Sequence, residues 1–379
     1  MQLKSSTRRG KTMQNNELFL SFNEKVMFSL RSLYSSYGYS QYKMSRFEEY
    51  DLYARNKDFL ISDSVITFTD TSGKLMALKP DVTLSIIKNI KEEPETLQKV
   101  FYNENVYRVS KGSHTYKEIM QAGLECFGDI DSYNICEVIT LAAKSLKSIS
   151  DSCVLDISHL GLLENVFESF SVPDFARSEL IKLIGEKNTH ELERLCEKLE
   201  IDSKSTQTLK LLVSTAGSPE EVLPILEKEL ADKTDITPII RLKNIFDAIE
   251  ESVKPMLRID FSVVNDIKYY NGIVFKGFIE GIPASVLSGG QYDKLMQKMN
   301  RRSGAIGFAV YLDMLERFNI SSNEYDIENL LIYSENSDLS KLNRYVKNLL
   351  KEGQTVLACK QIPQNTKYRR LINFDTEVG

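Results

Sequence analysis

Hydrophobic and polar positions change their spacing several times along the chain, and each spacing predicts a different element. Apolar residues recur at helical spacing over residues 16–36, which predicts an amphipathic helix. The stretch VITFTDTSGKLMALKP then alternates and turns at TSG, a pattern typical of a β-hairpin. A helix, DVTLSIIKNIKE, is expected after Pro80, with Asp81 as its cap.

Two longer strands are expected next, KVFYNENVYRV and EIMQAGLECFG, so residues 40–130 predict an antiparallel sheet with a helix or two against it. The helical period dominates residues 158–252 and predicts a helical insert. Strand patterns return in MLRIDFSVV, YYNGIVFKGFI and GAIGFAV. We therefore expect an α+β fold with a tail over residues 1–15, a core over 16–320 and a short α/β segment over 321–379.

Composition and charge argue against several classes of protein but do not identify a function. The 379 residues carry 48 basic and 53 acidic side chains, and this net charge of −5 argues against a broad nucleic-acid surface. No apolar run reaches the roughly 18 residues that span a bilayer, and the polar start does not resemble a secretory signal. Five scattered cysteines and three histidines offer no zinc-ligand spacing. We expect a cytoplasmic protein with reduced thiols, without a metal and without a membrane segment.

Polar side chains inside the predicted strands are the first candidates for a site. Gln121 and Glu125 share one strand face, and Arg108 ends the preceding strand, so all three can line one side of an antiparallel pair. This polar face is either a ligand pocket or a solvent-facing surface. Asp81 is either a helix cap alone or a ligand group as well, and His114 is more simply a solvated loop residue.

Two pairs of adjacent residues have simple structural explanations. Tyr269 and Tyr270 should straddle the faces of a strand, so at most one of them is expected in a pocket. Gly289 and Gly290 are most simply a turn that needs positive φ. Residue patterns alone thus predict a mixed α+β protein that binds an unidentified ligand.

Six segments in order resemble the catalytic core of class II histidyl-tRNA synthetases over residues 16–320. These segments are LKPDVT (78–83), VYRV (106–109), MQAGLECFG (120–128), YYNGIVFKG (269–277), SGGQYD (288–293) and GAIGFAV (304–310). The resemblance implies an antiparallel sheet flanked by helices, with the family's helical insert and an amino-acid pocket on the sheet.

The resemblance also implies roles for individual residues. In the synthetases, the first motif binds the amino group of histidine, the motif-2 arginine holds its carboxylate and the α-phosphate, and a tyrosine pair closes on the imidazole. The matching histidine-binding residues in this chain are Asp81, Thr83, Arg108, Gln121, Glu125, Tyr269 and Tyr270.

Other positions depart from the synthetase pattern. Asn265 replaces the arginine that activates the carboxylate, Met314 replaces the motif-3 arginine that contacts ATP, and Tyr311 replaces a motif-3 glycine. Phosphoryl chemistry depends on such cations, so we expect adenylation to be lost. Only about sixty residues follow Ser321, fewer than an anticodon-binding domain needs, and a tRNA partner is not expected.

This combination resembles the regulatory subunit of ATP phosphoribosyltransferase, a paralogue of the synthetase. The resemblance implies a chain without catalysis or a cofactor of its own. Such a chain dimerises and joins a short-form catalytic subunit, commonly four of each, and mediates feedback inhibition by L-histidine in the first step of histidine biosynthesis. The alternatives are a histidyl-tRNA synthetase that activates histidine with ATP, and a synthetase-like scaffold or RNA-binding protein without a ligand.

Overall fold

The chain forms two compact units, which are described separately. The structure is a computed structural model, and one of its units spans Val26–Leu315 while the other contains residues 325–378. The residues that it describes are 20–60, 65–90, 96–109, 115–263, 269–315 and 325–378. The first fifteen residues and His114 lie outside them.

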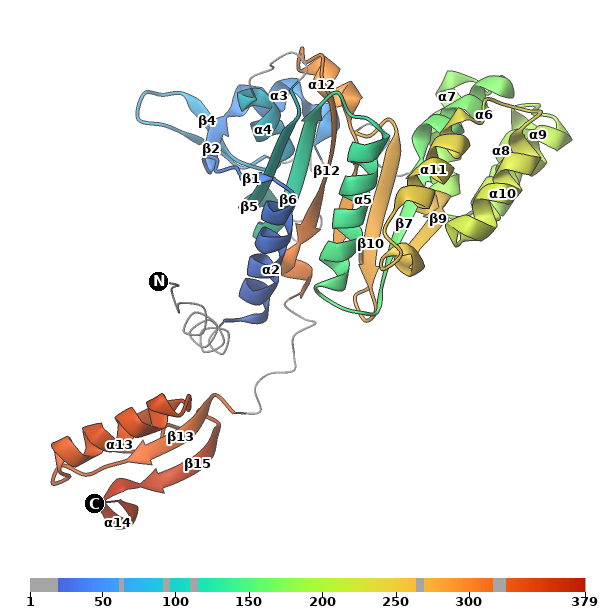
Figure 1. Cartoon of the computed structure of the whole chain (residues 1–379). Coiled ribbons are helices and arrows are strands. Elements are labelled where there is room, and N and C mark those ends of the chain that lie inside the picture. The colour runs from blue at the N-terminus through green and yellow to red at the C-terminus, as the bar shows by residue number, and fades with distance from the viewer. Residues whose placement is uncertain are drawn as a thin grey trace, which may run out of the picture. The chain divides into compact units, whose positions relative to one another are not determined.

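A nine-stranded sheet forms the centre of the larger unit (Figure 1), in the spatial order β1-β5-β6-β12-β11-β10-β7-β9-β8. All neighbouring strands in it are antiparallel except the pairs β1–β5 and β7–β9. In chain order its strands are β1 (Ser40–Gln41), β5 (Gln98–Val109), β6 (Tyr116–Gly128), β7 (Cys153–His159), β8 (Ala216–Gly217), β9 (Leu257–Asp260), β10 (Ile273–Ile279), β11 (Leu287–Gln291) and β12 (Gly304–Tyr311).

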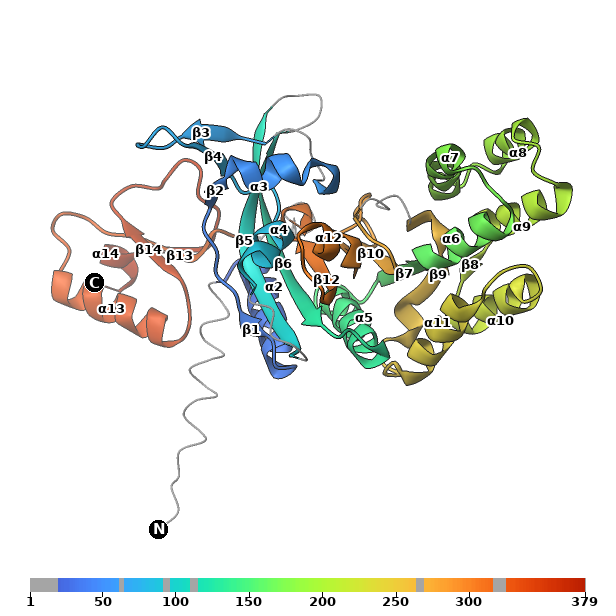
Figure 2. The same ribbon diagram turned by 90° about the horizontal axis from the view of Figure 1, so that it is seen from above.

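Helices cover the two faces of this sheet. Seen from above (Figure 2), α2 (Phe22–Ser36) and α5 (Ser132–Lys147) lie on one side of it. On the other side lie α3 (Tyr50–Arg55), α4 (Thr83–Asn89) and α12 (Asp293–Lys298). Leu146 of α5 packs directly on Gly277, where a β-carbon would come within 2.6 Å of its Cδ1 atom. The side chains that alternate with Gly277 along β10 therefore face away from α5.

The elements on the other face are short. They are α3 (Tyr50–Arg55), η2 (Lys57–Phe59), α4 (Thr83–Asn89), α12 (Asp293–Lys298) and the small antiparallel sheet β2 (Phe47–Glu49), β4 (Leu75–Leu78), β3 (Thr67–Thr69). One apolar cluster joins this layer, with Tyr53, Ile86 and Ile87 packed together with Leu295 and Met296. These elements position the loops that surround the candidate site.

Six helices follow one another between β7 and β9 and gather at one end of the large sheet (Figure 1). They are α6 (Leu160–Ser169), α7 (Asp174–Gly185), α8 (Thr189–Lys198), α9 (Ser203–Ser214), α10 (Pro219–Leu230) and α11 (Thr237–Ala248). The 3-10 turns η3 (Lys254–Met256), η4 (Phe261–Val263) and η5 (Leu312–Leu315) complete the unit. The predicted α+β fold, an antiparallel sheet flanked by helices with a helical insert, is confirmed.

The smaller unit is a three-stranded parallel sheet in the order β14-β13-β15 with two helices. Its elements are β13 (Ile327–Ile332), α13 (Leu339–Lys351), β14 (Val356–Cys359), β15 (Tyr368–Asn373) and α14 (Phe374–Glu377). Leu331, Leu342, Leu349, Ile372 and Phe374 form its core. Sequence analysis predicted a short α/β segment here but no strand at β15, in which YRRL places three polar or aromatic side chains before the buried Ile372.

The glycine pair was predicted wrongly as a turn, although Gly290 does have the expected positive φ, at 158°. Gly289 and Gly290 lie inside β11 rather than in a turn. A β-carbon on Gly289 would overlap the carbonyl oxygen of Gly307 and the Cβ atom of Phe308 on the neighbouring strand. Close packing between strands, not a turn, is therefore the reason for glycine here.

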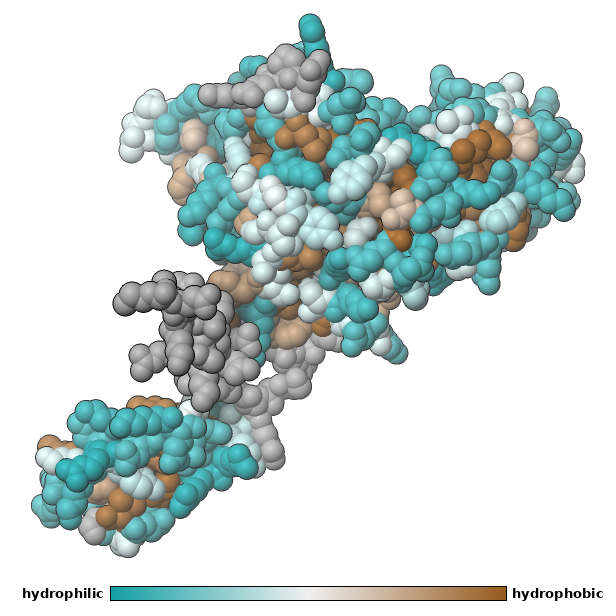
Figure 3. All heavy atoms as spheres, in the orientation of Figure 1, coloured by the Kyte–Doolittle hydropathy of each residue, from teal (hydrophilic) through white to brown (hydrophobic). Residues whose placement is uncertain are grey.

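The surface of both units is mainly hydrophilic in the view of Figure 3, with hydrophobic side chains in small groups. Among the described residues, no helix combines the length and the apolar composition that crossing a membrane would require.

Candidate functional site

A cavity of about 620 Å³ lies against the large sheet of the larger unit. It is lined by all seven residues for which the family resemblance implies a histidine pocket, and they come from four separate stretches of chain. These residues are Asp81, Thr83, Arg108, Gln121, Glu125, Tyr269 and Tyr270. A cavity of this size is ordinary for a small-molecule site.

Strand register explains how three of these side chains come together. Gln121 and Glu125 are four residues apart on β6, so they share one face. Arg108 of β5 pairs with Lys117 of β6, which has the same parity as Gln121 and Glu125, so it stands on that face too. The predicted grouping of these side chains on one side of the antiparallel pair agrees with this register.

Glu125 is the most deeply buried acidic group of the site, with 2% of its surface exposed. Its Oε1 atom accepts a 2.7 Å hydrogen bond from the hydroxyl of Thr83, and its Oε2 atom accepts one of 2.5 Å from the hydroxyl of Tyr292. The pKa of Glu125 is raised to about 8, chiefly because the side chain is buried; the two hydrogen bonds act to lower this pKa, and the nearby Asp81 acts to raise it. The site thus contains a carboxyl group that can gain or lose a proton near neutral pH.

Asp81 serves two purposes at once. Its Oδ1 atom accepts a 2.9 Å hydrogen bond from the backbone N–H of Leu84, in the first turn of α4, and its side chain also lines the cavity. Burial raises the pKa of Asp81, while the Leu84 N–H and the charge of Arg108 act in the opposite direction. Arg108 is itself oriented by a 3.1 Å hydrogen bond from Nε to the carbonyl oxygen of Pro80.

Glycine at position 307 leaves room for the Glu125 carboxylate. Gly307 pairs with Glu125 across β12 and β6, and a β-carbon on it would overlap Oε2 of Glu125. The Glu125 side chain therefore lies across its neighbouring strand, where it reaches Tyr292. Any other residue at position 307 would displace it.

The expectation that only one of the two adjacent tyrosines enters a pocket is wrong. Tyr269 and Tyr270 both line the cavity, with ring centroids 4.8 Å apart, and the ring of Tyr292 lies 5.6 Å from that of Tyr269. Both residues precede β10, which begins at Ile273, so the alternation of strand faces does not apply to them.

Sequence analysis missed several residues of the site. Tyr292 is 1% exposed and follows the glycine pair in SGGQYD, but nothing local links it to Glu125. Tyr311, noted only as a replacement for glycine, lines the cavity and shares a 2.7 Å hydrogen bond with Ser288. Lys276 lies opposite Ser288 in the register of β10 and β11 and also faces the cavity. Alternation along β10 and β11 could have placed Lys276 and Ser288 on this face.

One helix of the insert also borders the cavity. Ser178, Ile181 and Lys182 of α7 lie among its lining residues. The insert thus contributes directly to the boundary of the candidate site.

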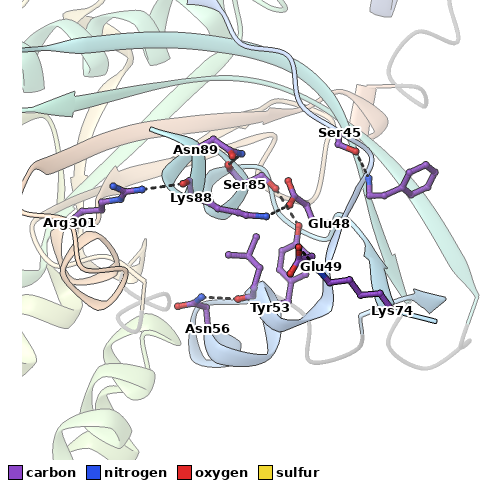
Figure 4. Close-up of polar contacts among 12 residues, drawn as sticks. Ser45, Glu48, Glu49, Tyr53, Asn56, Lys74, Ser85, Lys88, Asn89 and Arg301 are labelled. Atoms are coloured by element: carbon purple, nitrogen blue, oxygen red, sulfur yellow. Dashed lines mark hydrogen bonds and ion pairs between the residues drawn. The ribbon is translucent and has the colours of Figure 1, made fainter. Parts of the chain in front are cut away.

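Helix α4, which begins with Thr83, is tied to its surroundings by polar contacts (Figure 4). The ammonium group of Lys88 lies 2.7 Å from Oε2 of Glu48, and the hydroxyls of Tyr53 and Ser85 are 3.3 Å apart. Arg301 donates from Nη2 to the carbonyl oxygen of Lys88 at 3.1 Å. These contacts connect the helix to β2, to α3 and to the segment after α12.

Of the two positions at which this chain lacks a synthetase arginine, the structure describes only one. Asn265 lies outside the described residues. Met314 lies in η5 and is 40% exposed, and it is not among the described residues that line the cavity. The described residues also contain no group of three or more His, Cys, Asp or Glu side chains that could hold a metal ion.

A family model described as histidyl-tRNA synthetase matches residues 19–315, more than three quarters of the chain. The chain belongs to the histidyl-tRNA synthetase family. The match covers every strand of the large sheet, the helical insert and all the described residues that line the cavity.

Within this family, similar proteins carry two different names. The ATP phosphoribosyltransferase regulatory subunit of Oceanobacillus iheyensis is 29% identical over 294 residues, which cover 76% of this chain and 72% of that relative. The histidine–tRNA ligase of Methanococcus maripaludis is also 29% identical, over 343 residues that cover 86% and 80%.

Solved structures agree on the fold. One titled as an ATP phosphoribosyltransferase regulatory subunit/histidyl-tRNA synthetase from Bacillus halodurans has a TM-score of 0.77 at 20% identity and covers 93% of both chains. An ATP phosphoribosyl transferase complex from Thermotoga maritima contains a chain with a TM-score of 0.60 at 22% identity, covering 78% of this chain and 98% of that one.

Proposed function

We propose that this chain is the regulatory subunit of ATP phosphoribosyltransferase and binds free L-histidine in the cavity. One observation carries the proposal: seven residues expected to hold an amino acid surround a single cavity, with Glu125 buried among them. The regulatory-subunit name of relatives such as the Oceanobacillus iheyensis protein supports the same function. Histidine would act as the feedback inhibitor of the first step of its own biosynthesis.

The amino-acid end of the cavity suits the charges of histidine. The ammonium group would lie against Asp81 and Thr83, and the carboxylate against the guanidinium group of Arg108, which can hold two oxygens at once. The imidazole would lie beside Glu125 and the tyrosine pair. A ring N–H of the imidazole can donate a hydrogen bond to a buried carboxylate.

Adenylation would be absent from this chain, and catalysis would belong to a partner chain, the short-form phosphoribosyltransferase. The neutral side chain of Met314 supports this, because it offers no cation to ATP. We propose a cytoplasmic hetero-oligomer of four regulatory and four catalytic chains, with the regulatory chains dimerised and no tRNA partner.

Three measurements on the purified chain test the proposal. Calorimetry should show histidine binding that is clearly weaker in Glu125→Gln. Mixing with a short-form catalytic subunit should give a stable complex whose activity depends on this chain and falls when histidine is added. Histidine-dependent exchange of pyrophosphate into ATP should be absent, and its detection would instead favour the synthetase function carried by relatives such as the Methanococcus maripaludis ligase.

A further inference from the structure

Two short helices meet beside the cavity, and the start of each supplies one hydrogen bond to the same carboxylate. Thr83 is the first residue of α4, and Tyr292 immediately precedes α12. Their hydroxyls donate to the two different oxygens of Glu125. The geometry around Glu125 therefore depends on how α4 and α12 are placed relative to each other.

Arg301 links these helices at their other ends. It follows α12 by three residues, and its backbone N–H donates to the carbonyl oxygen of Met296 in that helix at 2.8 Å. Its Nη2 atom donates to the carbonyl oxygen of Lys88 at 3.1 Å (Figure 4) and to that of Ile87, also at 3.1 Å. Ile87 and Lys88 lie in the last turn of α4, where carbonyls lack helical partners and a positive charge is favourable.

Apolar packing makes the connection between the two helices stiff. Ile86 and Ile87 of α4 and Leu295 and Met296 of α12 are all fully buried in one cluster. Close-packed interiors of this kind transmit a displacement instead of absorbing it. A shift at Arg301 is thus expected to reach Thr83 and Tyr292.

We propose that Arg301 is a positioning residue for the ligand pocket, which holds α4 and α12 so that Thr83 and Tyr292 both keep their hydrogen bonds to Glu125. Arg301 is not among the described residues that line the cavity, so it acts through the two helices and not by contact with a ligand. The identity of the ligand, histidine, rests on the proposed function.

The test compares variants of the full chain by calorimetry with histidine and by ¹³C NMR titration of the Glu125 carboxyl group, assigned with Glu125→Gln. Arg301→Met should weaken histidine binding about tenfold, because the hydrogen bonds around a charged group are disturbed. It should also shift the titration of Glu125 to higher pH, because Thr83 and Tyr292 stabilise the ionised form. Arg301→Lys keeps the positive charge and a hydrogen-bond donor. Its histidine affinity and its Glu125 titration should therefore both lie close to those of the wild type.

Arg177→Met is the matched control. Arg177 donates from Nε to the carbonyl oxygen of Val172 at 3.3 Å, so its loss also removes an arginine–carbonyl contact, but within the insert. It should change neither histidine affinity nor the titration of Glu125. Wild-type affinity and an unshifted Glu125 titration in folded Arg301→Met would overturn the proposal.

Two further comparisons distinguish the possible outcomes. Should Arg301→Met not fold, Arg301→Gln gives the same comparison. In Thr83→Val, the additional effect of the Arg301 change should shrink, and full additivity would contradict action through Thr83. If the wild-type chain binds no histidine, the proposed function fails, while the carboxyl titration, which needs no ligand, still decides the role of Arg301.

Discussion

The hydroxyl of Tyr292 lies 2.5 Å from Oε2 of Glu125, although 167 residues separate the two along the chain. With Thr83 on the other oxygen, the buried carboxylate has a donor on each side. This arrangement holds an acidic side chain inside the protein without a cation bonded to it among the described residues. A ligand that donates hydrogen bonds or carries positive charge can therefore pair with the ionised form of Glu125.

Replacing Glu125 by glutamine should weaken histidine binding by about ten- to a hundredfold, as measured by calorimetry. The amide has one acceptor oxygen, so Thr83 and Tyr292 cannot both keep their hydrogen bonds, and the negative charge is lost. Glu186→Gln is the control, because Glu186 also lines the cavity but is exposed on the insert. Equal losses in the two variants would contradict a special role for Glu125.

The free energy of unfolding should fall as pH rises from about 5 to about 8. Burial raises the pKa of Glu125 from 4.5 to about 8, so in this window the folded chain keeps a proton that the unfolded chain has released. The sign follows from linkage, with a slope of up to about 1.4 kcal/mol per pH unit from this group. Urea unfolding of the wild type and Glu125→Gln at several pH values measures it, and parallel curves for the two proteins would count against the shifted pKa.

Histidine binding at pH 7 should release a proton from the protein. The free site holds Glu125 largely protonated, and a ligand that donates hydrogen bonds or carries positive charge favours the ionised carboxylate. Calorimetry in buffers of different ionisation enthalpy measures the number of protons released. The number should fall toward zero at pH 9, where the free site is already ionised, and a pH-independent value would rule out Glu125 as the source.

Gly307→Ala should abolish detectable histidine binding, as measured by calorimetry on protein that circular dichroism shows to be folded. The added methyl group would overlap the carboxylate of Glu125 and push it away from Tyr292. Gly217→Ala is a matched control in the insert, where the new β-carbon would lie 3.3 Å from a methyl group of Val222. Histidine affinity should be unchanged in that variant, and retained binding in Gly307→Ala would show that the carboxylate can move without loss.

A chain that ends at residue 320 should bind histidine within about twofold of the full chain. The described residues that line the cavity lie between Phe59 and Tyr311, all in the unit that spans Val26–Leu315. Calorimetry on the shortened chain tests this, and it also tests the predicted domain boundary near residue 320. A large loss of affinity would mean that the C-terminal segment supports the pocket.

Alternation along two strands was enough to place Arg108, Gln121 and Glu125 on one face. The two strands follow one another in the chain and pair directly, so the hydrophobic pattern of each strand sets the face on which its side chains lie. Asp81 could be predicted as a helix cap from the sequence. Whether its side chain also lines a ligand pocket could not be decided from the residue pattern alone. Strand β7 was not predicted, because polar residues interrupt its apolar pattern in CVLDISH.

Contacts between distant segments could not be predicted in this way. Tyr292 meets Glu125 only because β11 and β6 lie on either side of β12 in the sheet, an order that no local pattern encodes. The need for glycine at position 307 likewise arises from the Glu125 side chain, which comes from the neighbouring strand. The tyrosine pair was assigned to strand faces because the start of β10 at Ile273 could not be located to within a few residues.

The chain contains 18 tyrosines and no tryptophan, and five of these tyrosines line the cavity: Tyr102, Tyr269, Tyr270, Tyr292 and Tyr311. Ultraviolet emission from the protein therefore comes from phenol rings, without the stronger indole signal that hides them in most proteins. A carboxylate bonded to an excited phenol quenches its light by accepting the proton. Occupancy of the cavity should thus be visible as a change in intrinsic tyrosine fluorescence, so that the native chain can report its own ligand without a dye.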